Sequence, residues 1–179
     1  MRRVAVVGNS GSGKTTLGQA LAERLRVPFV ELDGIYHQAG WQPLPVADFR
    51  RRVAALVGGP AWVIDGNYSA VRDLVWAYAD TVVWLDLPRR TVMRQVLLRT
   101  VRRAVIRTEL WNGNRESLTG LFRLDPAESV LRWSWTRHEV YRRRYADAMN
   151  DPRHAHLGFV RIASRADAAR LLAGAVPPG

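Results

Sequence analysis

Eight consecutive residues near the start of the chain are spaced as in the G-x-x-x-x-G-K-[ST] phosphate loop: Gly8-Asn9-Ser10-Gly11-Ser12-Gly13-Lys14-Thr15. Glycines in such a loop allow successive backbone N–H groups to point inward at phosphate oxygens. The Lys14 ammonium then contacts the β- and γ-phosphates, and the Thr15 hydroxyl holds Mg²⁺. We therefore predict that these eight residues and Thr16 bind ATP, with Mg²⁺ as a second cofactor.

Lys14 is the single lysine of this 179-residue chain, in which the other 26 of the 27 basic residues are arginine. A slim ammonium fits between two phosphates, whereas the wide planar guanidinium of arginine does not replace it in such a loop. The loop also follows an apolar run at 3–7 and precedes a helical pattern at 15–26, the setting that a phosphate site requires. Lys14 is therefore a predicted catalytic residue; the alternative is a glycine-rich turn that binds nothing.

Two aspartates follow apolar segments that read as strands. Asp65 ends Trp62-Val63-Ile64, and a carboxylate there, beside a phosphate loop, holds Mg²⁺ directly or through water. Asp33 ends Val30-Glu31-Leu32, where it orients an acceptor hydroxyl and takes its proton. We predict Asp65 as a metal ligand with Thr15, and Asp33 as catalytic. The alternative for each is a turn carboxylate that ends a strand.

Three arginines recur at a spacing of four, Arg99, Arg103 and Arg107, and therefore share one face of an expected helix. Guanidinium groups so placed repel one another unless anions lie between them, as when a lid closes on a γ-phosphate. We predict catalytic roles for Arg99 and Arg103; the alternative is a solvated basic face. The polar turn at 110–117 is a candidate for the tip of the lid. Ring side chains at 36, 37 and 41 form either a substrate wall or a packed loop.

The composition places the chain among ordinary globular proteins. It is 47% hydrophobic, contains no cysteine and carries a net charge of +11, with fourteen arginines between positions 89 and 144. That excess favours an anion-binding surface, for nucleic acid or for the phosphates of small ligands. We expect a cytoplasmic protein without disulfides, signal peptide or membrane span, present as a monomer or homodimer.

Alternating strand and helix patterns predict an α/β fold with a parallel sheet covered by helices on both faces, in three layers. We predict one domain over residues 1–179, with an acceptor-side segment at about 34–60 and an arginine-rich helical lid at about 89–145. The expected strands are 3–7, 29–32, 62–64, 81–85 and 159–163. The expected helices are 15–26, 46–57, 91–106, 126–149 and 166–173.

Several blocks of the chain occur together in one known family: Gly8–Thr15, Leu32-Asp33, Gly40-Trp41, Trp62–Tyr68, Leu85–Pro88 and Asn112–Glu116. They resemble the bacterial topology modulation proteins, which are adenylate-kinase-like P-loop proteins, over roughly residues 3 to 165. The resemblance implies five parallel strands in the order 2-3-1-4-5, and ATP and Mg²⁺ at Lys14, Thr15 and Asp65. True adenylate kinases carry a longer acceptor insertion, so the compact plan is more similar to shikimate and gluconate kinases.

We therefore predict an ATP-dependent kinase that passes a γ-phosphoryl group to a small acceptor, a nucleoside or nucleotide among the candidates. One alternative is a nucleotide-dependent nucleic-acid-binding protein whose basic lid follows a phosphate backbone. A second alternative is an ATPase switch that has no acceptor.

Overall fold

A single parallel sheet forms the centre of the molecule. The computed structural model describes residues 1–106, 111–114 and 130–178, with the side chains at 103–106 and 130–133 left out. The strands are β1 Arg3–Gly8, β2 Phe29–Glu31, β3 Trp62–Asp65, β4 Thr81–Leu85 and β5 Gly158–Ile162. They pair in the order β2-β3-β1-β4-β5, and every pair is parallel. The predicted strand order is therefore confirmed, and the carboxyl ends of β1, β3 and β2 meet at one edge.

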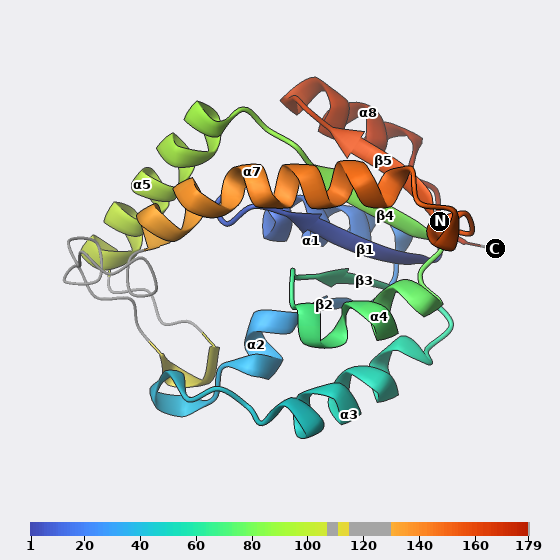
Figure 1. Ribbon diagram of the computed structural model, residues 1–179, viewed down its shortest axis with the longest axis horizontal. Helices are drawn as coiled ribbons and strands as arrows, with labels where there is room; N and C mark the ends of the chain where they lie inside the picture. Colours follow the sequence, from blue (N-terminus) through green and yellow to red (C-terminus); the bar gives the residue numbers. More distant parts are fainter. Residues whose placement is uncertain (107–110, 115–129, 179) are drawn as a thin grey trace.

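Helices cover both faces of the sheet, as predicted (Figure 1). Leu17, Leu21 and Leu25 of helix α1 pack on one face, against Val4 and Val6 of β1. The opposite face is buried by α3, α4 and α7. The described helices are α1 Lys14–Leu25, α2 Leu32–Tyr36, α3 Val46–Val57, α4 Ser69–Tyr78, α5 Arg89–Ile106, α7 Val130–Met149 and α8 Arg165–Gly174, with short 3₁₀ turns η1 Ala39–Trp41, η2 Trp111–Gly113 and η3 Pro152–His154.

Two elements differ from the sequence-based prediction. Leu32 does not end the second strand; it is buried at the start of α2, which places Asp33 in the first turn of a short helix. Helix α4 was not predicted, although Val71 and Val75 lie four residues apart and bury its inner face. The α4 pattern is short, and no side-chain cap marks its start, so its local signals are weak.

Helices α5 and α7, which contain most of the expected lid, pack against each other at one end of the molecule. Helix α7 continues from there across one face of the sheet (Figure 1). The expected lid at 89–145 is thus described as α5, α7 and the segment 111–114 between them. Arg107 and the other parts of this region, 107–110 and 115–129, lie outside the described residues. Among the helices that are described, none is both long and apolar enough to span a membrane.

Candidate nucleotide and acceptor site

The phosphate loop connects β1 to α1 and needs its glycines for two separate reasons. Gly8, Gly11 and Gly13 have φ angles of 146°, 77° and 93°, a region that favours glycine. A Cβ at Gly11 would also lie 2.1 Å from Cγ2 of Val96 on α5. The loop therefore has both the backbone conformation of a phosphate cradle and a lid helix packed directly on its tip.

Hydrogen bonds hold the side chains of Lys14 and Thr15, two predicted site residues. Nζ of Lys14 donates to the carbonyl oxygen of Asn9 at 3.2 Å, which keeps the ammonium folded over the cradle. The Thr15 hydroxyl donates to Oδ2 of Asp65 at 2.6 Å, joining the start of α1 to the end of β3. Parallel pairing of β1 with β3 brings these groups together from positions fifty residues apart.

Asp65 is 6% exposed and faces the loop. Burial raises the pKa of its carboxyl above the usual value, partly offset by the charge of Lys14 and the hydrogen bond from Thr15, while the charge of Asp33 raises it further. Its Oδ1 atom is buried and has no hydrogen-bond partner among the described residues. A buried carboxylate oxygen without a donor, beside a threonine hydroxyl, fits a hydrated Mg²⁺, which is usually held by one or two carboxylates.

Asn67, which the sequence analysis missed as a site residue, fastens the phosphate loop to β3. Its Oδ1 accepts from the backbone N–H of Gly8 at 3.1 Å, and its Nδ2 donates to the Gly8 carbonyl oxygen. The Tyr145 hydroxyl of α7 donates to the same Oδ1 at 2.8 Å. The position of Asn67 in the sequence could have indicated this role, because a polar amide two residues after a buried strand has few other partners.

Both lid helices contact the tip of the loop. Nδ2 of Asn9 donates to the carbonyl oxygen and to Oγ of Ser134 on α7, at 2.7 and 3.0 Å, and Ser134 Oγ donates to the Ser10 carbonyl oxygen at 3.1 Å. From α5, Nη2 of Arg99 donates to Oγ of Ser10 at 3.4 Å. Arg99 thus lies at the loop, as its predicted role requires. Arg103 is on α5, but its side chain is outside the described part of the chain.

Asp33, the predicted acceptor-side carboxylate, lies near Asp65 of the predicted nucleotide site. Its charge acts on Asp65, and its Oδ1 accepts a hydrogen bond from the Tyr68 hydroxyl at 2.6 Å. The Tyr68 ring packs against those of Tyr36 and Phe49, with centroids 4.7 and 5.2 Å away. The predicted acceptor-side carboxylate is therefore held by a tyrosine that follows the neighbouring strand β3.

The described part of the expected lid tip, residues 111–114, lies against the acceptor-side segment (Figure 1). We call these four residues the strap. The Trp111 indole N–H donates to the Glu31 carboxylate at 2.9 Å, and the Trp111 and His37 rings lie nearly parallel with centroids 6.5 Å apart. Trp111 of the strap therefore joins the rings of the predicted acceptor-side segment, a contact that the sequence analysis did not predict.

Asn114 fixes the strap to the backbone beneath it. It is 4% exposed; its Oδ1 accepts from the Trp41 N–H at 2.9 Å, and its Nδ2 donates to the Gln38 carbonyl oxygen at 2.9 Å. The predicted ring wall at 36, 37 and 41 is thus packed against itself and against the strap. Its rings form one cluster with Tyr68 and Trp111.

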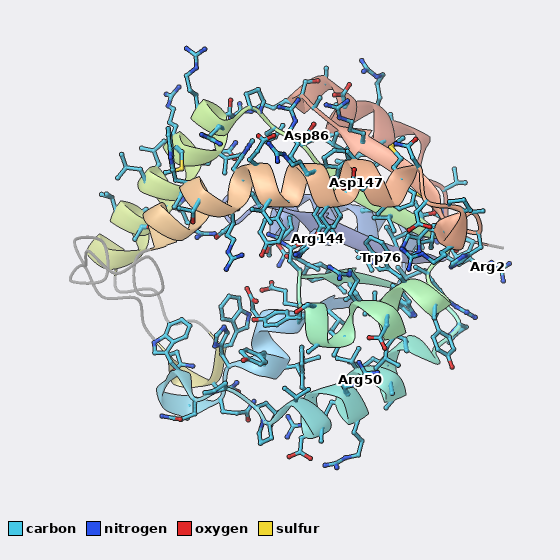
Figure 2. The ribbon with its side chains drawn as sticks, in the orientation of Figure 1. Arg2, Arg50, Trp76, Asp86, Arg144 and Asp147 are labelled. Carbon is cyan, nitrogen blue, oxygen red and sulfur yellow. The ribbon has the colours of Figure 1, made fainter. Side chains whose placement is uncertain are left out.

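Arginine charges act on the Tyr141 phenol of α7. The guanidinium carbon of Arg144 lies 5.5 Å from the centroid of the Tyr141 ring. Burial raises the pKa of Tyr141, the charges of Arg144, Arg137 and Arg72 lower it, and the charge of Asp33 raises it. Arg144 extends from α7 on the side that faces β3 (Figure 2). Nη1 of Arg72 is buried without a hydrogen-bond partner in the described structure, where no carboxylate pairs with Arg72 or Arg144.

A separate hollow opens at the carboxyl ends of β4 and β5, on the other side of α7. The cavity has a volume of about 610 Å³ and is lined by Pro88, Arg89, His138, Arg142, Arg161 and Ala163, among others. Asp86, at its base, pairs with Arg161 at 2.9 Å from Nε (Figure 2). In open α/β sheets, ligands bind at these carboxyl ends.

The chain is similar to several known proteins. The family model for shikimate kinase matches residues 10–47. The chain is 31% identical to a shikimate kinase of Nitrobacter winogradskyi over 156 residues, which are 79% of this chain and 65% of that protein. It is 28% identical to a shikimate kinase of Synechococcus elongatus over 141 residues, 62% of this chain and 70% of that one. The matched segment thus spans just under two thirds of the Nitrobacter protein.

Solved structures of the same kind share the whole architecture. A shikimate kinase from Bacteroides thetaiotaomicron superposes with a TM-score of 0.56 at 16% identity, covering 96% of this chain and 94% of that one. The fold is that of a P-loop kinase. A shikimate kinase from Acinetobacter baumannii in complex with shikimate gives a TM-score of 0.53 at 19% identity, covering 97% and 89%. None of these relatives is a topology modulation protein, so that narrower resemblance stays a prediction.

Proposed function

We propose that this protein is an ATP-dependent kinase that transfers the γ-phosphoryl group to a hydroxyl of a small, negatively charged acceptor. The observation that carries the proposal is the meeting of three elements at one sheet edge. They are the phosphate loop with Lys14, the Thr15–Asp65 pair, and Asp33 in the first turn of α2, directly after the adjacent strand β2. The phosphate loop and the Thr15–Asp65 pair suit the binding of a triphosphate and its metal, and the Asp33 carboxylate suits an acceptor hydroxyl.

The residues of the phosphate loop, Gly8 to Thr16, hold the triphosphate in this proposal, and the Lys14 ammonium stabilises charge on the transferred group. Thr15 and Asp65 hold Mg²⁺, which would neutralise charge on the β- and γ-phosphates. Asp33 orients the acceptor hydroxyl and takes its proton. Arg99 and Arg103 approach the γ-phosphate from α5, and the cavity beside Asp86 receives the nucleoside end of ATP.

The charge of the acceptor follows from the arginines beyond Asp33. A buried guanidinium nitrogen without an acceptor, as at Arg72, is costly unless a ligand supplies one. The charges of Arg72, Arg144 and Asp33 all act on Tyr141, and the Arg144 guanidinium lies over its ring. In this proposal, an acceptor that reaches Asp33 with a hydroxyl presents its other end to these arginines. A carboxylate at that end fits a planar guanidinium. Of the candidates in the sequence analysis, an uncharged nucleoside therefore suits this site less well than a hydroxy acid does, whereas a nucleotide shares the negative charge.

The test is a comparison of ADP production with candidate acceptors: shikimate, D-gluconate, nucleosides and a buffer-only control, each with ATP and Mg²⁺. We expect one hydroxy acid to stimulate ADP release well above buffer, together with a phosphorylated product. Equal ADP release under every condition would contradict a kinase and favour an ATPase switch. Stimulation by DNA alone would instead favour the nucleic-acid-binding alternative.

A further inference from the structure

The Tyr68 hydroxyl lies between two polar side chains of the acceptor side. It is 2.6 Å from Oδ1 of Asp33 and 3.3 Å from Nε2 of His37. Asp33 lies in the first turn of α2 and His37 directly after its last residue, whereas Tyr68 follows β3. Three groups that can carry or pass a proton thus form one chain of hydrogen bonds beside the predicted acceptor.

The protons of this chain can be counted. An ionised carboxylate only accepts hydrogen bonds, so the single proton of the phenol points to Asp33. Burial raises the pKa of Tyr68, and the charge of Asp33 and the hydrogen bond to it raise it further, so the phenol keeps that proton. His37 must then donate from Nε2, which in a neutral imidazole leaves Nδ1 as an acceptor. Nδ1 of His37 is buried and has no partner among the described residues.

We propose that Tyr68 and His37 are positioning residues for Asp33, a role that rests on the proposed kinase function. Tyr68 holds Oδ1 of Asp33, and His37 holds the phenol in the orientation that donates to it. In the described structure no hydrogen bond reaches Oδ2 of Asp33, so that oxygen is left to take the proton of the acceptor hydroxyl. Holding a base within hydrogen-bond reach of its proton is a condition for efficient transfer.

The Tyr68 ring also packs against Tyr36 and Phe49, so a purely structural role must be separated from the positioning role. Tyr68→Phe keeps the ring and removes only the hydroxyl. His37→Gln keeps an N–H donor at the ε position, and His37→Leu removes it. Tyr78→Phe, at an exposed tyrosine near the end of α4, is the matched control for loss of a phenol.

The first measurement is the tautomer of His37, read from long-range ¹H–¹⁵N spectra of the ¹⁵N-histidine-labelled protein at pH 8. The four histidines are assigned with His37→Gln. We expect the Nε2–H tautomer in the unsubstituted protein and in Tyr78→Phe, and loss of that preference in Tyr68→Phe. An unchanged tautomer in Tyr68→Phe would overturn the proposal, whatever the acceptor proves to be.

The second measurement is phosphoryl transfer to shikimate and to D-gluconate, set against ADP release in buffer alone. We expect Tyr68→Phe and His37→Leu to lower kcat for transfer about tenfold or more, with KM for ATP unchanged, and His37→Gln to restore most of it. A hydrogen bond that positions a reacting group contributes at about this level. Full transfer by Tyr68→Phe would refute the positioning role. If the unsubstituted enzyme uses neither acid, the proposed acceptor class fails, and the tautomer alone decides for or against this role.

Discussion

The nucleotide half of the site, residues 8–16 with Asp65, and the acceptor half, Asp33 with the ring cluster and the strap, are built in opposite ways. The first is one continuous loop plus one aspartate, joined by the Thr15–Asp65 hydrogen bond and fastened to the end of β3 by Asn67. The second is assembled from short pieces after β2, after β3, between the lid helices and along α7. Many proteins bind ATP, and one compact motif is enough to bind it. A particular acceptor requires side chains from several parts of the chain.

The contrast is clearest at Lys14, where the largest loss is expected. Lys14→Ala should lower kcat/KM by about 10³-fold or more, because a preorganised cation at developing charge contributes several kcal/mol. Lys14→Arg should recover little, since a guanidinium does not fit as a point charge does. Steady-state ADP assays on both variants measure this. Full activity in Lys14→Arg would show that the loop needs only charge, and the distinction between compact and assembled halves would weaken.

A separate loss should affect only the acceptor half. Asp33→Asn should lower phosphoryl transfer to the acceptor by about 10²- to 10⁴-fold, the range for a positioned base, and leave ATP affinity nearly unchanged. Calorimetry with ATP and Mg²⁺ gives the affinity, and product formation gives the transfer rate. The exposed Asp147→Asn on α7 is the matched control. Equal losses of binding and transfer would mean that the two halves act as one unit.

The strap should matter for stability as well as for the acceptor. Asn114→Ala leaves the Trp41 N–H and the Gln38 carbonyl oxygen without their buried partner. This should lower the free energy of unfolding by about 1–3 kcal/mol. Asn150→Ala, which removes an exposed hydrogen bond to the Ala146 carbonyl oxygen, should cost far less. Urea denaturation followed by tryptophan fluorescence compares the two, and equal costs would show that the strap is not held in place by Asn114.

The smallest expected effect is a gain in thermal stability, in the variant Asp65→Asn. Burial raises the folded-state pKa of Asp65, so the fold binds a proton there more tightly than the unfolded chain, and stability falls as pH rises through that pKa. Asp65→Asn removes this cost. The variant should melt a few degrees higher than the parent at pH 7 without Mg²⁺, at about 2–4 °C per kcal/mol. The parent should gain more Tm than the variant when Mg²⁺ and ATP are added, because the variant keeps the phosphate loop but lacks one predicted metal ligand; a lower Tm of the variant without metal would contradict the argument.

How far each half could be predicted follows from how it is built. The loop and the five strands agree with the sequence-based prediction because they depend on local spacing. The strand order also agrees, but it was implied by the family resemblance and not by the residues themselves. The links from Tyr68 to Asp33 and from Trp111 to Glu31 join residues 35 and 80 positions apart. No local pattern specifies such pairs, since they exist only once the chain has folded. Helix α4 was missed for the related reason that its signal is mainly a buried face.

The amide of Asn67 has a consequence for how the enzyme moves. Because it binds both the N–H and the carbonyl oxygen of Gly8, and is itself held by Tyr145, the root of the cradle cannot drift relative to the end of β3. We therefore expect this junction to stay in place when a nucleotide binds, with any rearrangement confined to the tip of the loop and the helices that contact it.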